Sequence, residues 1–144
     1  MVYIKKEFKF EAAHRLLGHR GLCINQHGHH YSVWIYARSK NDQLNDLGMV
    51  IDFSDLKKGI GQWLDNNWDH SFIWNEKDIR YERLYGIDGD LKNDKNFKLP
   101  GNPTAENMAL YLLNVCEKLY ENSTINIFKI EIFETDTSAA IVEK

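Results

Sequence analysis

The sequence predicts an α+β fold in which a four-stranded antiparallel sheet is covered on one face by two helices. Both ends of the chain carry pairs of segments in which apolar and polar residues alternate, the pattern of half-buried strands. The middle carries two segments whose apolar residues recur at helical spacing. The resulting order, ββααββ, favours a hairpin at each end and a helical layer between them.

Residues 2–14 and 27–38 are the first two predicted strands. In the first, one parity holds Phe8, Phe10, Ala12 and His14. In the second, the odd positions are His27, His29, Tyr31, Val33, Ile35 and Ala37. Residues 15–26 contain glycines, an asparagine and scattered charges, so we expect a loop between the two strands.

The two helices follow from apolar spacing and from their start signals. Ser54 is the predicted N-cap of the first helix, which should end near Asn66 and Asn67. Its repeating apolar residues are Leu56, Ile60, Trp63 and Leu64. Pro103 and Thr104 open the second helix. Its apolar stripe consists of Ala109, Leu112, Leu113, Cys116 and Leu119 or Tyr120.

Between the helices, residues 75–102 are charged and rich in Asp, Asn and Gly. We interpret most of them as a long surface loop with a short helix near Ile79–Tyr85. A loop of this length inside a compact domain is usually functional or mobile. The 144 residues otherwise fit one domain, so the prediction is a single domain over 1–144 with a long loop at about 76–100.

Residues 125–134 and 138–143 are the third and fourth predicted strands. In the third, Phe128, Ile130 and Ile132 share one parity, and Glu134 continues it. This places a carboxylate at the end of an apolar row. Such a group either lies at the sheet edge in water or meets a specific partner, for example the N–H and amino group of a guanidine-like ring edge.

Composition argues against several classes of partner. The chain has 18 basic and 21 acidic residues and a net charge of −3, so nucleic acid and anionic membranes are not expected partners. No signal-peptide-like or membrane-spanning apolar run occurs, which predicts a cytoplasmic protein. In a reducing compartment a disulfide between Cys23 and Cys116 is not expected.

Three histidines form a candidate zinc site. Side chains two apart on a strand point to the same side, so His27 and His29 can converge on one ion. If the first two strands pair antiparallel, His14 joins them, whereas His30 faces the other side of the sheet. Three protein ligands and an open position are typical of catalytic zinc. The alternative is that these are ordinary polar residues, since His-x-His alone is a weak pattern; His19, in the loop, is expected to be solvated.

The two cysteines and the Asp69-His70 pair are the other candidate reactive groups. Cys23, four residues before His27, is either a fourth zinc ligand or a base or nucleophile beside the metal, because a nearby cation favours thiolate. Cys116 lies on an apolar helix stripe and is interpreted as a small buried hydrophobe. Asp69-His70 is either an acid–base pair or a feature of a helix end.

Taken together, the motifs resemble the 6-pyruvoyltetrahydropterin synthase and 6-carboxytetrahydropterin synthase family. The resemblance extends over nearly the whole chain except about residues 76–100. The segments that carry it are Phe10-Glu11-Ala12-Ala13-His14-Arg15, Cys23-x-x-x-His27-Gly28-His29-His30-Tyr31, Val50-Ile51-Asp52-Phe53, Asp69-His70 with Asn75, Asn102-Pro103-Thr104-Ala105-Glu106-Asn107 and Glu134-Thr135.

This resemblance implies specific roles for residues. It implies that zinc is held by His14, His27 and His29, and that Cys23 is a catalytic thiolate partnered by the acid–base pair of Asp69 and His70. It also implies contacts to the pterin ring, with Glu134 as the anchor and with Thr135 and Thr104 or Glu106 as its helpers.

The resemblance also implies a substrate and an assembly. The family acts on 7,8-dihydroneopterin triphosphate, with zinc as a Lewis acid toward the side chain. Its fold is the tunnelling fold, in which trimers close their sheets into a barrel and pair into homohexamers, with active sites between subunits. Asp69 and His70 therefore need not face Cys23 of their own chain.

Within the family, the Cys-x3-His spacing resembles the bacterial carboxy type. That type is a carbon–oxygen lyase that releases acetaldehyde and triphosphate on the route to queuosine and related deazaguanines. The alternatives are the pyruvoyl type, which eliminates triphosphate, and a non-catalytic zinc- or pterin-binding module. The stretch 76–100 departs from the compact bacterial form, because it is longer.

Overall fold

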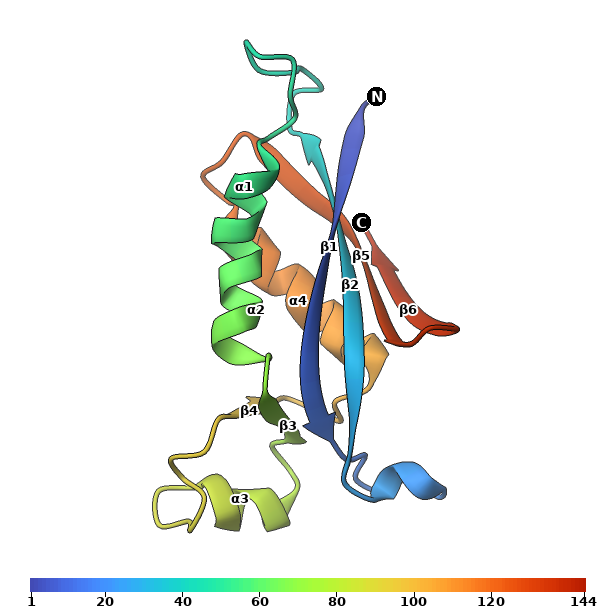
Figure 1. The fold of residues 1–144 in the computed structure, drawn as a ribbon, viewed down its shortest axis with the longest axis vertical. Helices are drawn as coiled ribbons and strands as arrows, with labels where there is room; N and C mark the ends of the chain where they lie inside the picture. The colour runs from blue at the N-terminus through green and yellow to red at the C-terminus, as the bar shows by residue number, and fades with distance from the viewer.

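The computed structural model describes all 144 residues as one curved sheet with helices packed on one of its faces (Figure 1). The long strands are β1 (Tyr3–His14), β2 (His27–Ser39), β5 (Ile125–Thr135) and β6 (Ser138–Glu143). All their mutual pairings are antiparallel. The predicted antiparallel core of four strands is therefore confirmed.

The complete sheet has six strands in the order β4-β3-β1-β2-β5-β6, so the prediction of four was wrong in number. The additional strands are β3 (Ser71–Asn75) and β4 (Asn96–Leu99), and β3 pairs in parallel with both β1 and β4. Both are too short to show a clear alternation, and both lie in or beside the polar segment interpreted as a loop. The predicted short helix in that segment is present as α3 (Ile79–Tyr85).

The first long helix is built from α1 (Phe53–Leu56), a π-helical turn η2 (Lys57–Gly61) and α2 (Gln62–Asn67). Its N-cap is Asp52, whose side chain accepts a hydrogen bond from the Ser54 backbone N–H at 2.7 Å. The prediction of Ser54 as the cap was wrong. Aspartate and serine are equally good caps, so spacing could not choose between neighbours that both qualify.

The π-helical turn has a cause in the packing of Tyr120. The Tyr120 hydroxyl accepts a hydrogen bond from the Ile60 backbone N–H at 3.1 Å. The turn widens to admit this hydroxyl, and Gly59 leaves room for it. A Cβ atom on Gly59 would lie 2.3 Å from the Tyr120 hydroxyl oxygen and 3.0 Å from Cζ.

Gly59→Ala is therefore expected to destabilise the protein by about 1–3 kcal/mol, the usual cost of overpacking a core. The Tyr120 ring is held by its own hydrogen bond and cannot move away freely. Urea unfolding should show a lower midpoint with an unchanged slope. Lys58→Ala, exposed on the same turn, is the matched control and should change stability by less than about 0.5 kcal/mol. Equal stability of the two variants would contradict the packing argument.

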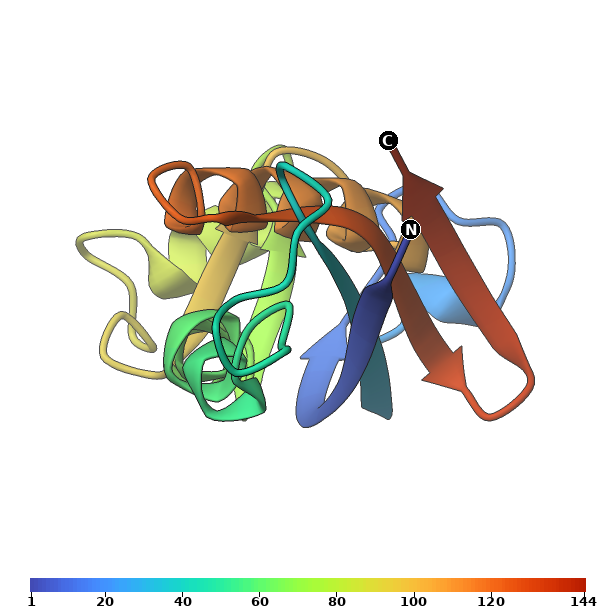
Figure 2. The ribbon, with the colours of Figure 1, turned by 90° about the horizontal axis from the view of Figure 1, so that it is seen from above.

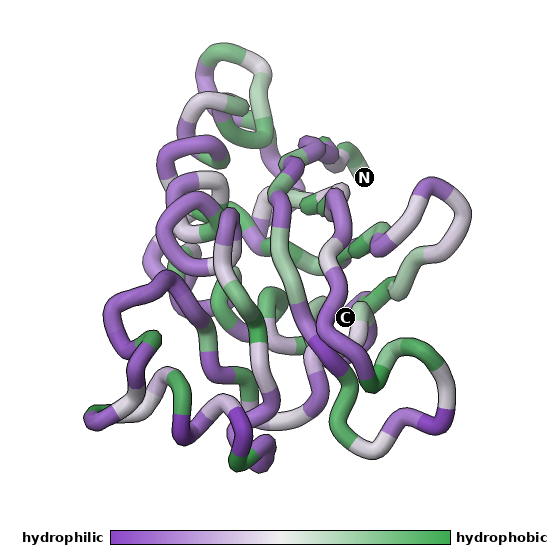
Figure 3. The backbone as a smooth tube through the Cα atoms, turned by 60° about the horizontal axis from the view of Figure 1, so that its bottom comes forward, coloured by the Kyte–Doolittle hydropathy of each residue, from purple (hydrophilic) through white to green (hydrophobic).

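The helix α4 (Ala105–Leu119) has Thr104 as its N-cap, so it begins where Pro103 and Thr104 were predicted to open it. It packs with the first long helix against the same sheet face, and Figure 2 shows both on one side of the curved sheet. The shared core includes Phe10, Tyr31, Val33, Ile35, Leu56, Ile60, Leu64, Met108, Leu112, Cys116, Ile130 and Ile132. Hydrophobic and hydrophilic segments follow one another along the strands in Figure 3. None of the helices combines the length and apolar character needed to cross a membrane.

A β-bulge changes one predicted face. The register between β2 and β5 shifts between Tyr36 and Ala37, and this places Phe128 beside Tyr36 on the face away from the helices, with ring centroids 6.3 Å apart. The prediction that Phe128 shares a face with Ile130 was wrong for this reason, and Ile127 enters the core instead. Beyond the bulge, Ile130 and Ile132 keep the predicted face.

Candidate metal centre

Three histidines converge at the end of the β1–β2 hairpin, as the strand parity predicted. His14 ends β1 and lies directly opposite His27, the first residue of β2, and His29 lies one side-chain repeat further along. One ring nitrogen from each of the three lies within 4.8 Å of those of the other two. His30 is excluded, because it points to the other face and its Nδ1 lies 2.6 Å from Glu11 Oε1.

The backbone fixes two of these rings in one tautomer. His14 Nδ1 donates a hydrogen bond to the Pro103 carbonyl at 2.7 Å, and His27 Nδ1 donates to the Asn25 carbonyl at 2.8 Å. Because a carbonyl only accepts, the protons are on Nδ1 and the lone pairs are on Nε2 when the rings are neutral. The two Nε2 atoms then face each other at 3.0 Å with no proton between them. A cation between the rings would turn this repulsion into attraction.

His29 supports the same conclusion independently. Its Nε2 atom is buried and has no hydrogen-bond partner. Buried polar atoms without partners are rare in folded proteins, and a missing ion is one common explanation. Three imidazole nitrogens with a further position left open fit a zinc ion of the catalytic type, so these residues fit the predicted cofactor.

The protonation states also suit a metal ion. Burial lowers the pKa of His14 from 6.5 to about 4, and the neighbouring His27 and His29 act in the same direction, while the hydrogen bond to Pro103 opposes it. Burial likewise lowers the pKa of His29, against the opposing influence of Glu134. Metal binding requires neutral imidazole, so neither ring has to lose a proton near pH 7.

The metal-free protein is therefore expected to lose about 3 kcal/mol of stability as the pH falls from about 6.5 to about 4. Below pH 6.5 the unfolded His14 takes up a proton, whereas the folded one stays neutral until about pH 4, so unfolding is favoured across this window. Urea unfolding of protein stripped with a chelator measures the effect at each pH. His14→Gln removes the titrating group, and an unchanged pH dependence in this variant would contradict the assignment.

Glu134 faces the histidines. Its Oε1 lies 3.4 Å from His14 Nε2 and 3.7 Å from His29 Nε2. Of the two sequence interpretations, a specific partner is thus favoured over a position in water at the sheet edge. Thr135 is exposed and its side chain lies in a groove with His30 and Ser32 on the other face. The structure therefore does not bring the side chains of Glu134 and Thr135 together.

Cys23 lies in a short 3₁₀ turn, Leu22–Ile24, and is half-buried. Its backbone carbonyl accepts a hydrogen bond from the Leu16 N–H at 2.8 Å. Its thiol is not part of the cluster of ligand atoms, which contains the three histidines alone. The structure thus does not include Cys23 among the ligand atoms, and its role as a base or nucleophile stays a prediction. Cys116 is fully buried, and burial raises the pKa of its thiol, which agrees with a structural role.

Asp69 and His70 form the predicted pair. His70 Nδ1 lies 2.8 Å from Asp69 Oδ2, while Asp69 Oδ1 accepts from the Glu11 N–H at 2.9 Å and the His70 N–H donates to the Glu11 carbonyl at 2.6 Å. Desolvation raises the pKa of Asp69, but the hydrogen bonds from the Glu11 backbone and from His70, together with the charges of His70 and Lys95, outweigh it and lower the pKa. The positive φ of His70, 56°, allows two adjacent residues to bond in this way.

This pair faces a different side of the sheet from the three histidines. The His70 imidazole is 76% exposed and borders an open pocket of about 520 Å³, which is also lined by Glu11, Gly28, His29 and His30. The metal-site histidines share the parity of the core residues Phe10, Ala12 and Tyr31. An exposed imidazole held by a carboxylate is suited to act on a group that is brought to it from outside its own chain.

The two remaining predicted residues lie at the start of α4. Thr104 is the N-cap, and its Oγ1 accepts from the Asn107 N–H at 3.1 Å, so it already has a structural role. Glu106 is exposed on the first turn. Sequence reasoning missed the role of the neighbouring Pro103 carbonyl, which orients His14; a backbone acceptor leaves no signal in the side-chain pattern.

The chain is similar to named proteins over almost its whole length. Residues 3–144 match the family model described as 6-pyruvoyl tetrahydropterin synthase. The chain is 36% identical over 137 residues to the 6-carboxy-5,6,7,8-tetrahydropterin synthase of Rickettsia bellii, covering 94% of this chain and 95% of that protein. It is 36% identical over 142 residues to the protein of the same name from Haemophilus influenzae, covering 96% of each.

Solved structures show the same fold. An uncharacterized protein from Wolinella succinogenes superposes with a TM-score of 0.84 at 22% identity, covering 99% of this chain and 98% of that one. The 6-pyruvoyl tetrahydropterin synthase of Caenorhabditis elegans superposes with a TM-score of 0.68 at 25% identity, covering 99% and 95%.

Proposed function

The chain belongs to the 6-pyruvoyl tetrahydropterin synthase family, and we propose that it is a zinc-dependent 6-carboxy-5,6,7,8-tetrahydropterin synthase. The observation that carries the proposal is the triad His14, His27 and His29, in a chain 36% identical to a protein of that name over 94% of its length. The Cys-x3-His spacing before the triad supports the carboxy type over the pyruvoyl type.

The proposed reaction converts 7,8-dihydroneopterin triphosphate and water into 6-carboxytetrahydropterin, acetaldehyde and triphosphate, within queuosine and deazaguanine biosynthesis. Zinc, when bound to the three histidines, supplies Lewis acidity toward the side-chain hydroxyls and the carbonyl that develops there. The Pro103 and Asn25 carbonyls keep the His14 and His27 rings turned toward the ion.

Cys23 and His70 divide the proton transfers in this proposal. Cys23 removes a proton from the substrate side chain, and His70, held by Asp69, donates or accepts a proton on the opposite side. Because His70 faces away from the triad of its own chain, the proposal assigns it to the site of a neighbouring copy. This is supported by its exposure and fits a homohexamer of paired trimers, in which sites lie between subunits.

The position of Glu134 bears on how the pterin ring is held. Its carboxylate lies next to the ligand nitrogens, whereas the guanidine-like edge of a pterin is at the far end of the ring from the reacting side chain. Glu134 stays the proposed anchor of the pterin ring, with Thr135 and Thr104 or Glu106 as its helpers. The Glu134 carboxylate can accept two parallel hydrogen bonds from that edge, and Glu106 is exposed beside Thr104 at the start of α4. The Thr135 side chain lies on the opposite face of the sheet, so its proposed contact to the pterin ring would come from that face.

One experiment separates the candidate functions. Purified, zinc-loaded protein is incubated with 7,8-dihydroneopterin triphosphate, and the products are identified by mass. The carboxy type yields acetaldehyde with 6-carboxytetrahydropterin. The pyruvoyl type, which the family description and the Caenorhabditis structure keep as the second candidate, yields triphosphate without acetaldehyde. A non-catalytic module binds zinc and leaves the substrate unchanged.

A further inference from the structure

The Cys23 loop, residues 15–26, has its own turns: the His19 N–H donates to the Leu16 carbonyl at 3.2 Å, and the Asn25 N–H donates to the Leu22 carbonyl at 2.9 Å across the 3₁₀ turn that contains Cys23. The β1–β2 ladder ends at the pair His14 and His27, so the whole loop lies outside it. Within the loop, the Leu16 N–H holds the Cys23 carbonyl at 2.8 Å. The placement of this turn relative to the rest of the chain therefore depends on what fixes Leu16 and the two ends of the loop.

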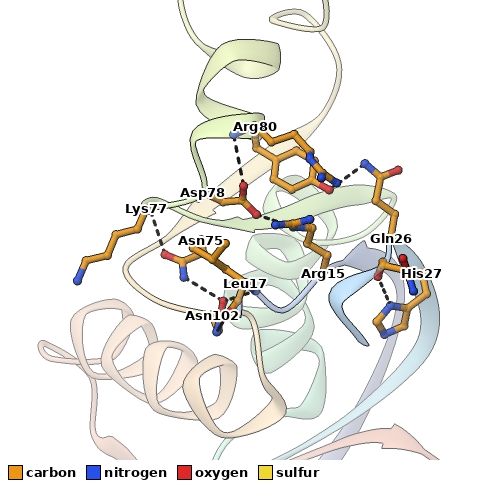
Figure 4. A network of polar contacts seen from close by, with 11 residues as sticks. Arg15, Leu17, Gln26, His27, Asn75, Lys77, Asp78, Arg80 and Asn102 are labelled. Atoms are coloured by element: carbon orange, nitrogen blue, oxygen red, sulfur yellow. Dashed lines mark hydrogen bonds and ion pairs between the residues drawn. The ribbon is translucent and has the colours of Figure 1, made fainter. Parts of the chain in front are cut away.

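Both neighbours of Leu16 are fixed by residues from a distant part of the chain. Arg15 Nε donates to Asp78 Oδ2 at 2.7 Å in an almost fully buried ion pair. Leu17 makes two hydrogen bonds to the Asn102 side chain, each of 2.9 Å, and Asn75 holds Asn102 in turn at 2.9 Å (Figure 4). Leu16 is thus held between two clamped residues.

The other end of the loop is held by Tyr81. Gln26 Nε2 donates to the Tyr81 hydroxyl at 2.8 Å. Tyr81 is 1% exposed and packs against Phe72 with ring centroids 4.5 Å apart, so its hydroxyl is a fixed point. The Arg15 guanidinium lies 5.9 Å from the centroid of the Tyr81 ring, so this one residue contacts both ends of the loop.

Asp78 joins these contacts to α3. The same carboxylate that binds Arg15 also caps the helix, because Asp78 Oδ1 accepts from the Arg80 N–H at 3.3 Å. Formation of α3 and support of the Cys23 loop are therefore two effects of one side chain. The long segment at 76–100 therefore supports the Cys23 loop, a role that its sequence did not reveal.

We propose that Tyr81 and Asp78 are positioning residues for Cys23: α3 holds the two ends of the Cys23 loop and so keeps the thiol in a fixed place. The proposal rests on the function proposed above, in which Cys23 is the catalytic thiol. It does not involve the metal ligands themselves, which are oriented by Pro103 and Asn25.

Tyr81→Phe tests the proposal, because it removes one hydroxyl and leaves the buried ring in place. Asp78 is less suitable, since replacing it strands the buried Arg15 charge and can prevent folding. In Tyr81→Phe, amide hydrogen exchange over residues 18–25 should become faster and iodoacetamide should alkylate Cys23 faster, each by about 3- to 10-fold. Cys116 is fully buried and does not interfere. Zinc content should stay at the wild-type level.

For turnover, kcat should fall by about 3- to 10-fold while KM changes little, because substrate binding does not use the hydroxyl. Tyr85→Phe is the matched control: it lies on the same helix, 6.1 Å from the Tyr81 ring, and its hydroxyl has no hydrogen bond. It should behave as wild type. Combining Tyr81→Phe with Gln26→Ala should add nothing to either single change.

Wild-type exchange and alkylation rates in Tyr81→Phe would overturn the proposal. Loss of zinc together with faster alkylation would do so as well, since the change would then loosen the whole site. If the loop loosens and kcat is unchanged, the catalytic thiol does not need this support, and the positioning role is refuted. A wild-type protein that fails to turn over the pterin refutes the proposed function instead, and the exchange and alkylation rates still decide whether α3 positions the thiol.

Discussion

His29→Ala is expected to lower zinc affinity by more than about 100-fold, whereas His30→Ala should leave it unchanged. Changes to groups that merely orient a ligand already cost about 10- to 100-fold in metal affinity, and removal of a ligand should exceed that. The two histidines are neighbours on the same strand, so the two variants remove the same side chain from nearly the same place. They differ in direction: His29 Nε2 is buried among the ligand nitrogens, and His30 is paired with Glu11 on the other face.

Zinc content after dialysis against a competing chelator measures the difference, with thermal unfolding as a check on folding. Added zinc should raise the melting temperature of the wild type and of His30→Ala and should leave that of His29→Ala unchanged, because a ligand stabilises only a protein that binds it. Retention of zinc by His29→Ala would show that the triad is not the site. Equal loss in both variants would point to a general disturbance of the hairpin.

The arrangement of this triad was predictable because it depends only on the two-residue alternation of side chains along a strand. Strand side chains alternate, so the sequence alone separates His29 from His30, and the antiparallel hairpin brings His14 opposite His27. The hairpins at the two ends were predictable for the same reason. The three histidines also needed no bulge or loop conformation to meet.

The features that the sequence did not reveal depend on contacts between distant segments. The strands β3 and β4 are short and acquire their strand character from tertiary pairing, of β3 with β1 and of β4 with β3, which overrides local pattern. The bulge at Phe128 reverses the face of that residue, and no spacing rule marks it. Asp78 and Tyr81 lie in a segment whose polar composition indicates a loop, and their partners Arg15 and Gln26 are more than fifty residues away.

Glu134 shows which part of the site strand parity alone can predict. The sequence placed its carboxylate at the end of an apolar row and left open whether water or a partner receives it. The structure provides the partners, His14 and His29, because β5 runs beside β2 and delivers Glu134 to the same end of the sheet. The face was thus predictable, whereas the neighbours on that face required the topology.

Cys23→Ala is expected to lower turnover of 7,8-dihydroneopterin triphosphate by about 10²- to 10⁴-fold while zinc remains bound. This is the usual contribution of a positioned acid or base to a proton transfer. Zinc should be retained because the ligand cluster consists of the three histidines and does not include the thiol. The substrate should still bind, so kcat should carry the loss and KM should change little.

Cys116→Ala is the matched control for loss of a thiol. It leaves a small cavity in the core and should cost stability, yet turnover should stay close to wild type, because Cys116 is fully buried between α4 and the sheet. Loss of zinc from Cys23→Ala would identify Cys23 as a ligand and remove its role as a base. Full turnover with zinc bound would instead show that another group removes the proton. Glu134, whose Oε1 lies 3.4 Å from His14 Nε2, is the carboxylate beside the metal ligands.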